Sequence, residues 1–245
     1  SAQVFEYLQH AEDYGLKVKE YDKDFDAVVN RSRAVADTMS KGVQFLLKKN
    51  KIDVIMGYGS LLPGKKIHVK AEDGSEQELS AQNIIIATGA RSRELPSLPQ
   101  DGKKVIGYRK AMTLEKQPKK LIVVGSGAIG VEFAYFYNAM GTEVTLIEYL
   151  PRIVPVEDEE ISKQMERSFK KSGIKVMTSA EVTSVDTSGK GVKATVKTKK
   201  GEEVVEADVV LSAVGIKTNI ENIGLETVGI ATDRDKILVN DFYQT

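Results

Sequence analysis

Three glycines in the middle of the chain have the spacing that can hold a phosphate-bearing ligand. Gly125, Gly127 and Gly130 form the pattern G-x-G-x-x-G within the stretch VVGSGAIGVEFA. The first glycine of this pattern permits a tight turn, the second lets the backbone approach a pyrophosphate, and the third lets a helix pack closely on a strand. The N–H groups and the positive dipole end of that helix then face the phosphates. The pattern therefore predicts a dinucleotide site.

Glu148 supplies the acid that such a site needs, 23 residues after Gly125. A carboxylate here can accept hydrogen bonds from both ribose hydroxyls of an adenosine and repels a 2′-phosphate, which favours NAD over NADP. A glutamate at a strand end is more commonly solvated. The combination of strand, glycines, helix, strand and acid nevertheless favours the binding role. Arg152 could reach a 2′-phosphate, but we interpret it as a surface residue.

A βαβ unit is expected to carry these residues. Apolar periodicity predicts a strand at Leu121–Val124, a helix at Ala128–Met140 and a strand at Glu143–Ile147. Gly141 suits the position just after the helix. The residues that this helix is expected to bury are Ile129, Phe133, Phe136 and Met140.

The residues before this unit predict helices, hairpins and one buried strand. We expect a short helix at 2–13, a long helix from Asp24 to about Asn50, and hairpins with turns at Gly64 and Gly74. The segment NIIIATGARS is expected to be a buried strand, and the polar residues 91–118 a connection between domains. The apolar stripe expected on the long helix is Phe25, Val28, Val35, Met39, Val43 and Leu46.

The residues after the unit predict a helix at 158–171, the strand IKVM, an antiparallel meander, and an apolar strand that leads to Gly215. One further strand, KILVN, lies in the tail. The runs IIIATG and VLSAVG resemble each other. Two domains built on one plan and chance similarity of two buried strands explain this equally well.

Composition excludes several classes of function. Lys plus Arg and Asp plus Glu both total 35 in 245 residues, so the charge does not favour nucleic acid or a membrane surface as partner. The sequence contains no cysteine, and His10 and His68 lie far apart. We therefore expect no metal site and no catalytic residue within these residues. The apolar runs have the length of strands, and the polar N-terminus is unlike a secretory signal.

The order of five segments resembles the two-dinucleotide flavoprotein disulfide reductases, and within them the dihydrolipoamide dehydrogenase branch. The segments are GYG at 57–59, NIIIATGA at 83–90, VVGSGAIGVEFA at 123–134, LIEYLPRIVPVEDEEISKQM at 146–165 and ADVVLSAVG at 207–215. The resemblance implies an α/β fold with two Rossmann-like, three-layer nucleotide-binding domains, the NAD domain being inserted in an incomplete FAD domain. The implied limits are a partial FAD domain at 1–108, an NAD domain at 109–228 and a return segment at 229–245.

The resemblance also implies roles for residues that spacing alone does not single out. The residues implied to contact FAD are Gly59, Thr88, Gly89 and Ala90. The residues implied to contact NAD, beside the three glycines and Glu148, are Ser126, Ala128, Ile129, Val131, Glu132, Val182 and Gly215. Glu132 could instead be favoured by the helix dipole in the first turn, and Ile129 could be a core residue.

The family pattern is incomplete in this sequence. The FAD-binding glycine turn, the C-x4-C redox pair, the Gly-Asp that follows DFYQT and the interface domain with its His-Glu pair are missing, and Thr218 replaces the usual proline. We expect a central fragment that is inactive by itself and binds FAD poorly. The parent is expected to be a cytoplasmic homodimer that oxidises dihydrolipoamide, carried on a lipoyl domain or acyltransferase, with FAD as cofactor and NAD⁺ as acceptor.

Two other interpretations stay open. The chain could derive from a relative such as a glutathione or mercuric reductase or a transhydrogenase, although Glu148 argues against users of NADPH. It could also be a stand-alone NAD-binding module. That interpretation explains the glycine turn but not the order in which GYG and ATGA precede it.

Overall fold

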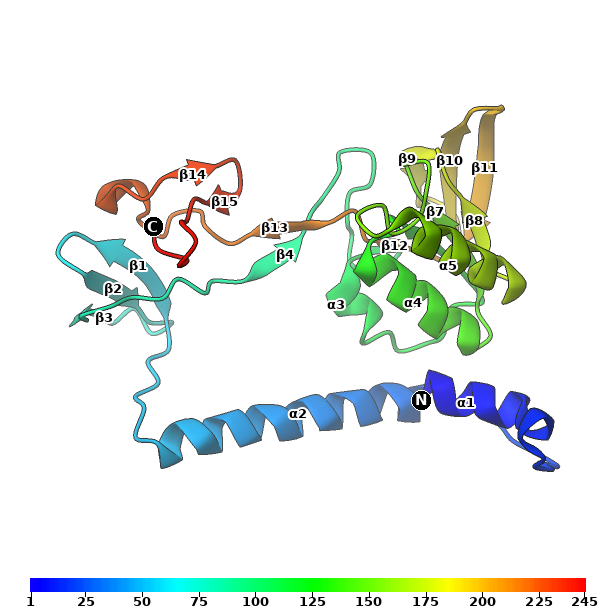
Figure 1. Cartoon of the computed structure of the whole chain (residues 1–245), viewed down its shortest axis with the longest axis horizontal. Helices are drawn as coiled ribbons and strands as arrows, with labels where there is room; N and C mark the ends of the chain where they lie inside the picture. The colour runs from blue at the N-terminus through cyan, green and yellow to red at the C-terminus, as the bar shows by residue number, and fades with distance from the viewer. The chain divides into compact units, whose positions relative to one another are not determined.

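The computed structural model describes residues 1–245, and these divide into two compact units (Figure 1). The first unit comprises Ser1–Ala36 and Ser92–Gly215, and the second comprises Asp37–Arg91 and Ile216–Thr245. The predicted limits at 108 and 228 separate an FAD-binding domain from an NAD-binding domain. The two compact units do not test which cofactor each part binds, so these limits stay a prediction. The fold is mixed α/β with a parallel sheet, as expected.

A five-stranded parallel sheet forms the centre of the first unit, in the order β5-β12-β6-β7-β8. The chain runs from β6 to β7 to β8 on one side of β6 and places β12 on its other side. Ligands of such open sheets bind where the strand order reverses, at the carboxyl ends of the strands. The strands are β5 (Val105–Ile106), β6 (Lys120–Val124), β7 (Glu143–Ile147), β8 (Lys175–Met177) and β12 (Val209–Ser212).

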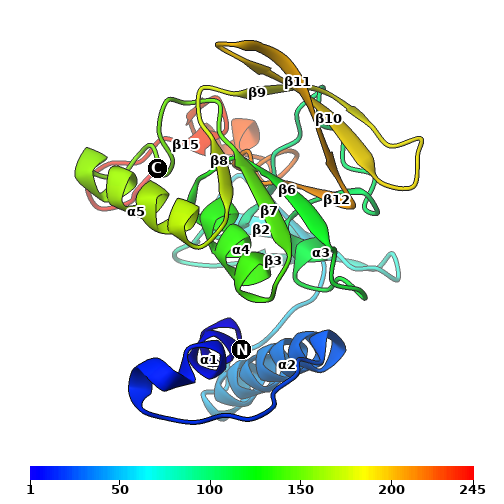
Figure 2. The same ribbon diagram turned by 90° about the vertical axis from the view of Figure 1, so that its right-hand side faces the viewer.

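Side chains alternate across this sheet and bury two separate cores. Leu121 and Val123 of β6 pack with the helices on one face, whereas Ile122 and Val124 pack with an antiparallel meander on the other (Figure 2). The unit therefore has three layers. The covering elements are the helices α3 (Tyr108–Ala111), α4 (Ala128–Ala139) and α5 (Glu159–Lys171) and the meander strands β9 (Glu181–Asp186), β10 (Val192–Thr198) and β11 (Gly201–Ala207).

The helices of the βαβ region begin and end where the sequence predicts. Asp158 caps α5 by accepting hydrogen bonds from Glu160 N at 2.8 Å and Ile161 N at 3.3 Å. Gly141 follows α4 with a φ of +84°. The expected burial is confirmed for Met140, which is 1% exposed, and holds only in part for the other expected residues of α4. Tyr137 is fully buried and donates to the carbonyl of Ala111, whereas Ile129, Phe133 and Phe136 are only half-buried.

The N-terminal helices only partly match the prediction. Instead of one helix at 2–13, α1 (Ala2–Gln9) is followed by a short 3-10 helix, η1 (Ala11–Tyr14). The long helix α2 (Phe25–Lys49) is confirmed, but no residue of it is buried. Only Phe25 and Val28 of its predicted stripe are half-buried, and the four remaining members are exposed, as with Met39 at 68%. Beyond the first turns of α2, no apolar surface of residues 1–245 covers the stripe.

Apart from Asp37–Lys49 of α2, the second unit consists of short antiparallel strands and one 3-10 helix. The predicted hairpins are confirmed, with turns at Gly64 and Gly74. Residues 84–87 of the predicted buried strand are not a strand, and Ile85 is 91% exposed, because no strand of the described chain pairs with them. The elements are β1 (Tyr58–Leu62), β2 (Lys66–Lys70), β3 (Glu76–Ser80), β4 (Ala90–Ser92, whose last residue belongs to the first unit), β13 (Ile216–Thr218), η2 (Glu226–Val228), β14 (Thr232–Asp233) and β15 (Lys236–Ile237).

Two smaller expectations also require correction. Residues 91–118 are more than a connection, because Val105–Ile106 add the edge strand β5 to the parallel sheet. The tail strand expected over KILVN is limited to Lys236–Ile237, paired with β14. No helix combines the length and the apolar character needed to cross a membrane.

Candidate functional site: a glycine turn beside a buried glutamate

The predicted glycine turn joins β6 to α4 at the carboxyl edge of the parallel sheet. Gly125 has a φ of +96°, and a Cβ there would collide with the carbonyl of Ala213. A Cβ on Gly130 would collide with the carbonyl of Gly125, so this glycine permits the close packing of helix on strand. A Cβ on Gly127 would meet nothing within 4 Å. The middle glycine is therefore required by no contact within the chain, which fits the approach of a ligand.

The N-terminus of α4 presents backbone donors beside Gly127. This glycine caps the helix with an extended backbone, and the first intrahelical bond runs from Val131 N to Gly127 O at 3.1 Å. The N–H groups of Ala128, Ile129 and Gly130 precede that bond and have no carbonyl one turn earlier in the helix. They form the kind of N-terminus that binds phosphate.

Glu148 lies at the end of β7, next to the glycine turn, and is 7% exposed. One carboxylate oxygen, Oε2, accepts from Ser126 N at 2.8 Å and from Ser126 Oγ at 2.6 Å. The other oxygen, Oε1, accepts from Leu150 N at 2.8 Å. Three donors therefore fix the orientation of this carboxylate. Glu148 is therefore buried and hydrogen-bonded, unlike the solvated glutamate that is more common at the end of a strand.

Further predicted residues of α4 occupy different environments. Val131 is buried in the helix-side core, and the half-buried Ile129 packs against the same core. Packing accounts for both, and their contact with a nucleotide stays a prediction. Glu132 is exposed and lies beyond the first turn, which contains no acidic residue, so the expected position in the first turn is wrong. The dipole argument for Glu132 is correspondingly weaker, because the effect falls off after one turn.

Val182 and Gly215, which are also predicted to contact NAD, lie outside the βαβ unit that carries the glycine turn. Val182 in β9 is buried in the meander-side core, where it packs with residues such as Ile147, and its contact with adenine stays a prediction. Gly215 is exposed, follows β12 and has a φ of +107°. Its position at the carboxyl edge of the sheet is compatible with a ligand contact.

Arg152 is engaged with its own loop. Its Nη2 donates to Pro155 O at 3.0 Å, and its Nη1 lies 4.0 Å from Glu159 Oε2. Arg152 and the neighbouring Lys163 hold the pKa of Glu159 below its ordinary value, Lys163 having the larger effect. The guanidinium is thus already paired with acceptors of the chain, in agreement with its interpretation as a surface residue.

The residues predicted for a second nucleotide lie in the second unit. Gly59 lies in β1, and a Cβ there would make an ordinary contact with Ile67 at 3.6 Å. Gly57 is the sterically required glycine of the GYG segment. Its φ is +150°, and a Cβ would approach both Lys70 O and the Val69 side chain to 2.7 Å. The fold therefore does not require a glycine at position 59.

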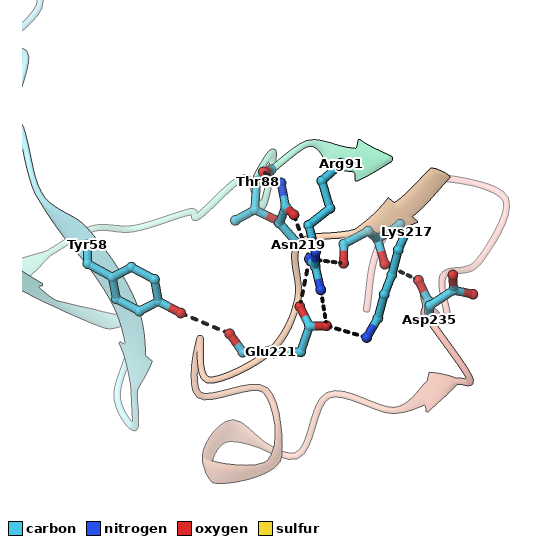
Figure 3. A network of polar contacts seen from close by, with 8 residues as sticks. Tyr58, Thr88, Arg91, Lys217, Asn219, Glu221 and Asp235 are labelled. Atoms are coloured by element: carbon cyan, nitrogen blue, oxygen red, sulfur yellow. Dashed lines mark hydrogen bonds and ion pairs between the residues drawn. The ribbon is translucent and has the colours of Figure 1, made fainter. Parts of the chain in front are cut away.

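Thr88 and Gly89 form an exposed loop, and the half-exposed Ala90 at its end is the first residue of β4. Asn219, just after β13, binds the carbonyls of Thr88 and Gly89 at the start of this loop, and Figure 3 shows the contact with Thr88. Asn219 N donates to Gly89 O at 3.0 Å, and Asn219 Nδ2 donates to Thr88 O at 3.1 Å. No pattern in the sequence singles out Asn219. No local spacing links two segments that lie about 130 positions apart.

Comparison with known proteins identifies what this arrangement is similar to. The family model described as pyridine nucleotide-disulphide oxidoreductase matches residues 5–245. A dihydrolipoyl dehydrogenase of Zymomonas mobilis is 42% identical over the whole chain, which covers 53% of that protein. The dihydrolipoyl dehydrogenase of Bacillus subtilis is 39% identical, with 100% of this chain and 54% of that protein covered.

Similarity extends to a plant protein and to a solved structure. A mitochondrial dihydrolipoyl dehydrogenase of Pisum sativum is 36% identical over the whole chain and 50% of its own length. The crystal structure of LpdA from Mycobacterium tuberculosis superposes with a TM-score of 0.88 at 30% identity, over 98% of this chain and 52% of that one. The chain thus spans about half the length of the relatives that it matches.

Proposed function

Because the chain belongs to the pyridine nucleotide-disulphide oxidoreductase family, we propose that its first unit binds NAD in a dihydrolipoyl dehydrogenase. One observation carries the choice of NAD: the carboxylate of Glu148 is held beside the glycine turn by Ser126 and Leu150 N. An acid in this position accepts hydrogen bonds from ribose hydroxyls and repels a 2′-phosphate.

The residues present fit a dinucleotide. Space beside Gly127 admits the pyrophosphate, the first N–H groups of α4 bind its oxygens, and Glu148 orients the adenosine ribose. Gly125 and Gly130 act indirectly, by bringing the helix N-terminus close to the end of β6. The exposed Gly215 lies at the same edge of the sheet, as the family resemblance implies for the nicotinamide half.

The second unit is proposed to form part of an FAD site. In the loop Thr88–Ala90 the carbonyls of Thr88 and Gly89 are bound to Asn219, and Gly59 lies at an exposed position of β1. When bound, FAD supplies the redox chemistry that connects a dithiol to the nicotinamide. This part of the proposal includes the finer domain arrangement, with the NAD domain at 109–228 inserted between two FAD segments, 1–108 and 229–245.

The substrate and partners follow from the same relatives. We propose dihydrolipoamide, carried on a lipoyl domain or acyltransferase, as the dithiol, and a cytoplasmic homodimer as the assembled enzyme. The 245 residues contain no cysteine, so we expect this chain alone to form no NADH from dihydrolipoamide and NAD⁺, even with FAD added. Measurable turnover by the chain alone would contradict that expectation.

Isothermal titration of the chain with NADH and with NADPH tests the nucleotide proposal. We expect NADH to bind at least about tenfold more tightly, a difference of ~1.4 kcal/mol, because a 2′-phosphate faces the carboxylate of Glu148. The matched variant Glu148→Gln should lose most of this discrimination and still bind NADH. Equal affinities in the wild-type chain, or a preference for NADPH, would refute the assignment of NAD.

A further inference from the structure

A cluster of charged and amide side chains links β4 to the segment after β13, and the proposed function uses only its contact with the loop Thr88–Ala90. Arg91 pairs with both oxygens of Glu221, from Nη2 to Oε1 at 2.6 Å and from Nη1 to Oε2 at 3.1 Å (Figure 3). Lys217 Nζ lies 2.7 Å from Oε1 of the same carboxylate. We call Arg91, Lys217, Asn219 and Glu221 the Arg91 cluster.

Neighbouring contacts hold the cluster in place. Thr218, between Lys217 and Asn219, donates from its hydroxyl to the carbonyl of Asp235, and Tyr58 Oη donates to Glu221 O at 2.9 Å. The hydrogen bonds from Arg91 and Lys217 hold the pKa of Glu221 far below its ordinary range. The carboxylate therefore stays charged at neutral pH, where it keeps its two-point contact with the guanidinium of Arg91.

Asn219 transmits the position of Arg91 to the loop Thr88–Ala90. Arg91 Nη1 donates to Asn219 Oδ1 at 2.8 Å. Because a guanidinium can only donate, it fixes the amide oxygen toward itself and the amide NH₂ toward the loop. That NH₂ donates to Thr88 O at 3.1 Å, while the backbone N of Asn219 donates to Gly89 O at 3.0 Å.

These bonds determine where the N–H groups of the loop point. In a trans peptide the C=O and the N–H point in opposite directions. With the carbonyls of Thr88 and Gly89 turned toward Asn219, the N–H groups of Gly89 and Ala90 are directed away from it. Gly89 has a φ of +71°, which lets two successive carbonyls reach the same residue. The loop thus offers two neighbouring donors on the face opposite the Arg91 cluster.

We propose that Arg91, Asn219 and Glu221 are positioning residues that orient the Gly89 and Ala90 N–H groups toward polar acceptors of FAD. This inference rests on the proposed function, because it assumes that the loop Thr88–Ala90 contacts FAD. Glu221 fixes the guanidinium, the guanidinium fixes the amide of Asn219, and the amide fixes the peptide between Thr88 and Gly89. None of the three residues needs to touch the cofactor.

The variant Asn219→Asp tests the last of these contacts, the hydrogen bond from the amide NH₂ of Asn219 to Thr88 O. An aspartate keeps the oxygen that Arg91 binds and loses the NH₂ that Thr88 O accepts from.

The test measures FAD binding by the full-length protein of the proposal after removal of its flavin, together with the melting temperature of the flavin-free form. Asn219→Ala removes both bonds of the side chain. Lys66→Ala is the matched control, because its ion pair with Glu78 at 3.2 Å is about as exposed as Arg91–Glu221 and contacts no predicted site residue.

The expected result is a separation of binding from folding. Asn219→Asp should raise the FAD dissociation constant by about twofold to tenfold, as the loss of the bond to Thr88 O implies, and Asn219→Ala, which removes both side-chain bonds, should raise it at least as much. The melting temperature of the flavin-free protein should change no more than in Lys66→Ala. Wild-type affinity in Asn219→Asp overturns the inference, and so does a loss of affinity matched by a loss of stability. A wild-type protein that takes up no FAD instead refutes the proposed function.

Discussion

Gly127 and Gly130 differ in what a methyl group at each position would meet, and this difference separates binding from folding. A Cβ on Gly130 collides with Gly125 O, whereas one on Gly127 meets nothing within 4 Å. We expect Gly130→Ala to lower the free energy of unfolding by about 1–3 kcal/mol, as overpacking does. Gly127→Ala should fold normally and bind NADH at least about tenfold more weakly, a cost of ~1.4 kcal/mol. Thermal melts and NADH titration of both variants check this.

The outcome for Gly127→Ala decides between two explanations of the glycine pattern. If this variant melted as the wild type does and still bound NADH with wild-type affinity, no ligand would approach the open side of the turn. The pattern would then only serve the packing of α4 on β6.

Ser126 is expected to act through Glu148. Its hydroxyl donates to Glu148 Oε2 at 2.6 Å, and Ser126 itself has no exposed surface. Ser126→Ala removes one of the three hydrogen bonds that orient the carboxylate, so NADH should bind about threefold to tenfold more weakly, corresponding to ~1 kcal/mol. The measurement is a double-mutant cycle with Glu148→Ala. In the Glu148→Ala background the serine substitution should have almost no effect, and an equal effect in both backgrounds would mean that Ser126 acts independently.

Residues within one motif could be predicted from the sequence, and residues linked across the chain could not. The glycines and Glu148 share a short βαβ unit, so fixed strand and helix lengths bring them together. The contact of Asn219 with Thr88 joins segments 131 positions apart, and polar residues in loops have no periodicity from which such a pairing could be derived. Tyr137 was missed for another reason, because the apolar spacing of α4 suits more than one face.

The docking of α1 on α4 depends on a hydrogen bond that titrates at high pH. Tyr135 Oη donates to Glu6 Oε2 at 2.6 Å. This bond, with a smaller effect of burial, raises the pKa of Tyr135 to about 12. Because the ordinary tyrosine pKa is about 10, the contribution to stability is complete below pH ~10 and is lost as the pH rises through 12.

Removal of that hydroxyl should release α1 without unfolding the sheet. We expect Tyr135→Phe to speed amide exchange in Ala2–Gln9 at neutral pH and to remove a tyrosine ionisation near pH 12 from the ultraviolet titration. The exposed Tyr149 provides the control variant Tyr149→Phe, which should leave α1 unchanged. Unchanged exchange in Tyr135→Phe would show that the other contacts between α1 and α4 suffice to dock it.

Helices and strands were predicted well where the elements that they pack against belong to this chain. The βαβ unit and the meander bury apolar residues against each other, so local periodicity and tertiary packing agree. Residues 84–87 and most of the stripe of α2 have the apolar pattern of buried elements, but none of these residues is fully buried, and Ile85 and Met39 are exposed. Periodicity indicates that a face is apolar. It does not identify the surface that covers that face.

The two units differ in how much apolar core each contains. In the second unit only Val69, Ile223 and Leu225 are buried apolar residues, whereas the first unit contains both large clusters. Local opening requires little free energy where few apolar contacts must be broken. Hydrogen exchange of the 245-residue chain should therefore show slow amides in β6, β7 and β12, and fast ones in the second unit. Comparable protection of β1–β3 would contradict this.

Addition of NADH should increase that difference rather than reduce it. A ligand that binds only the folded first unit stabilises it by RT ln(1 + [L]/Kd), or about 2.7 kcal/mol at a concentration of 100 Kd. Slow amides around Gly125–Gly130 and Glu148 should exchange still more slowly, and amides of β1–β3 and β14–β15 should not change. NADPH at the same concentration is the control and should protect less, because Glu148 disfavours its 2′-phosphate. Protection that spread equally over both units would show that the nucleotide site is not confined to the parallel sheet.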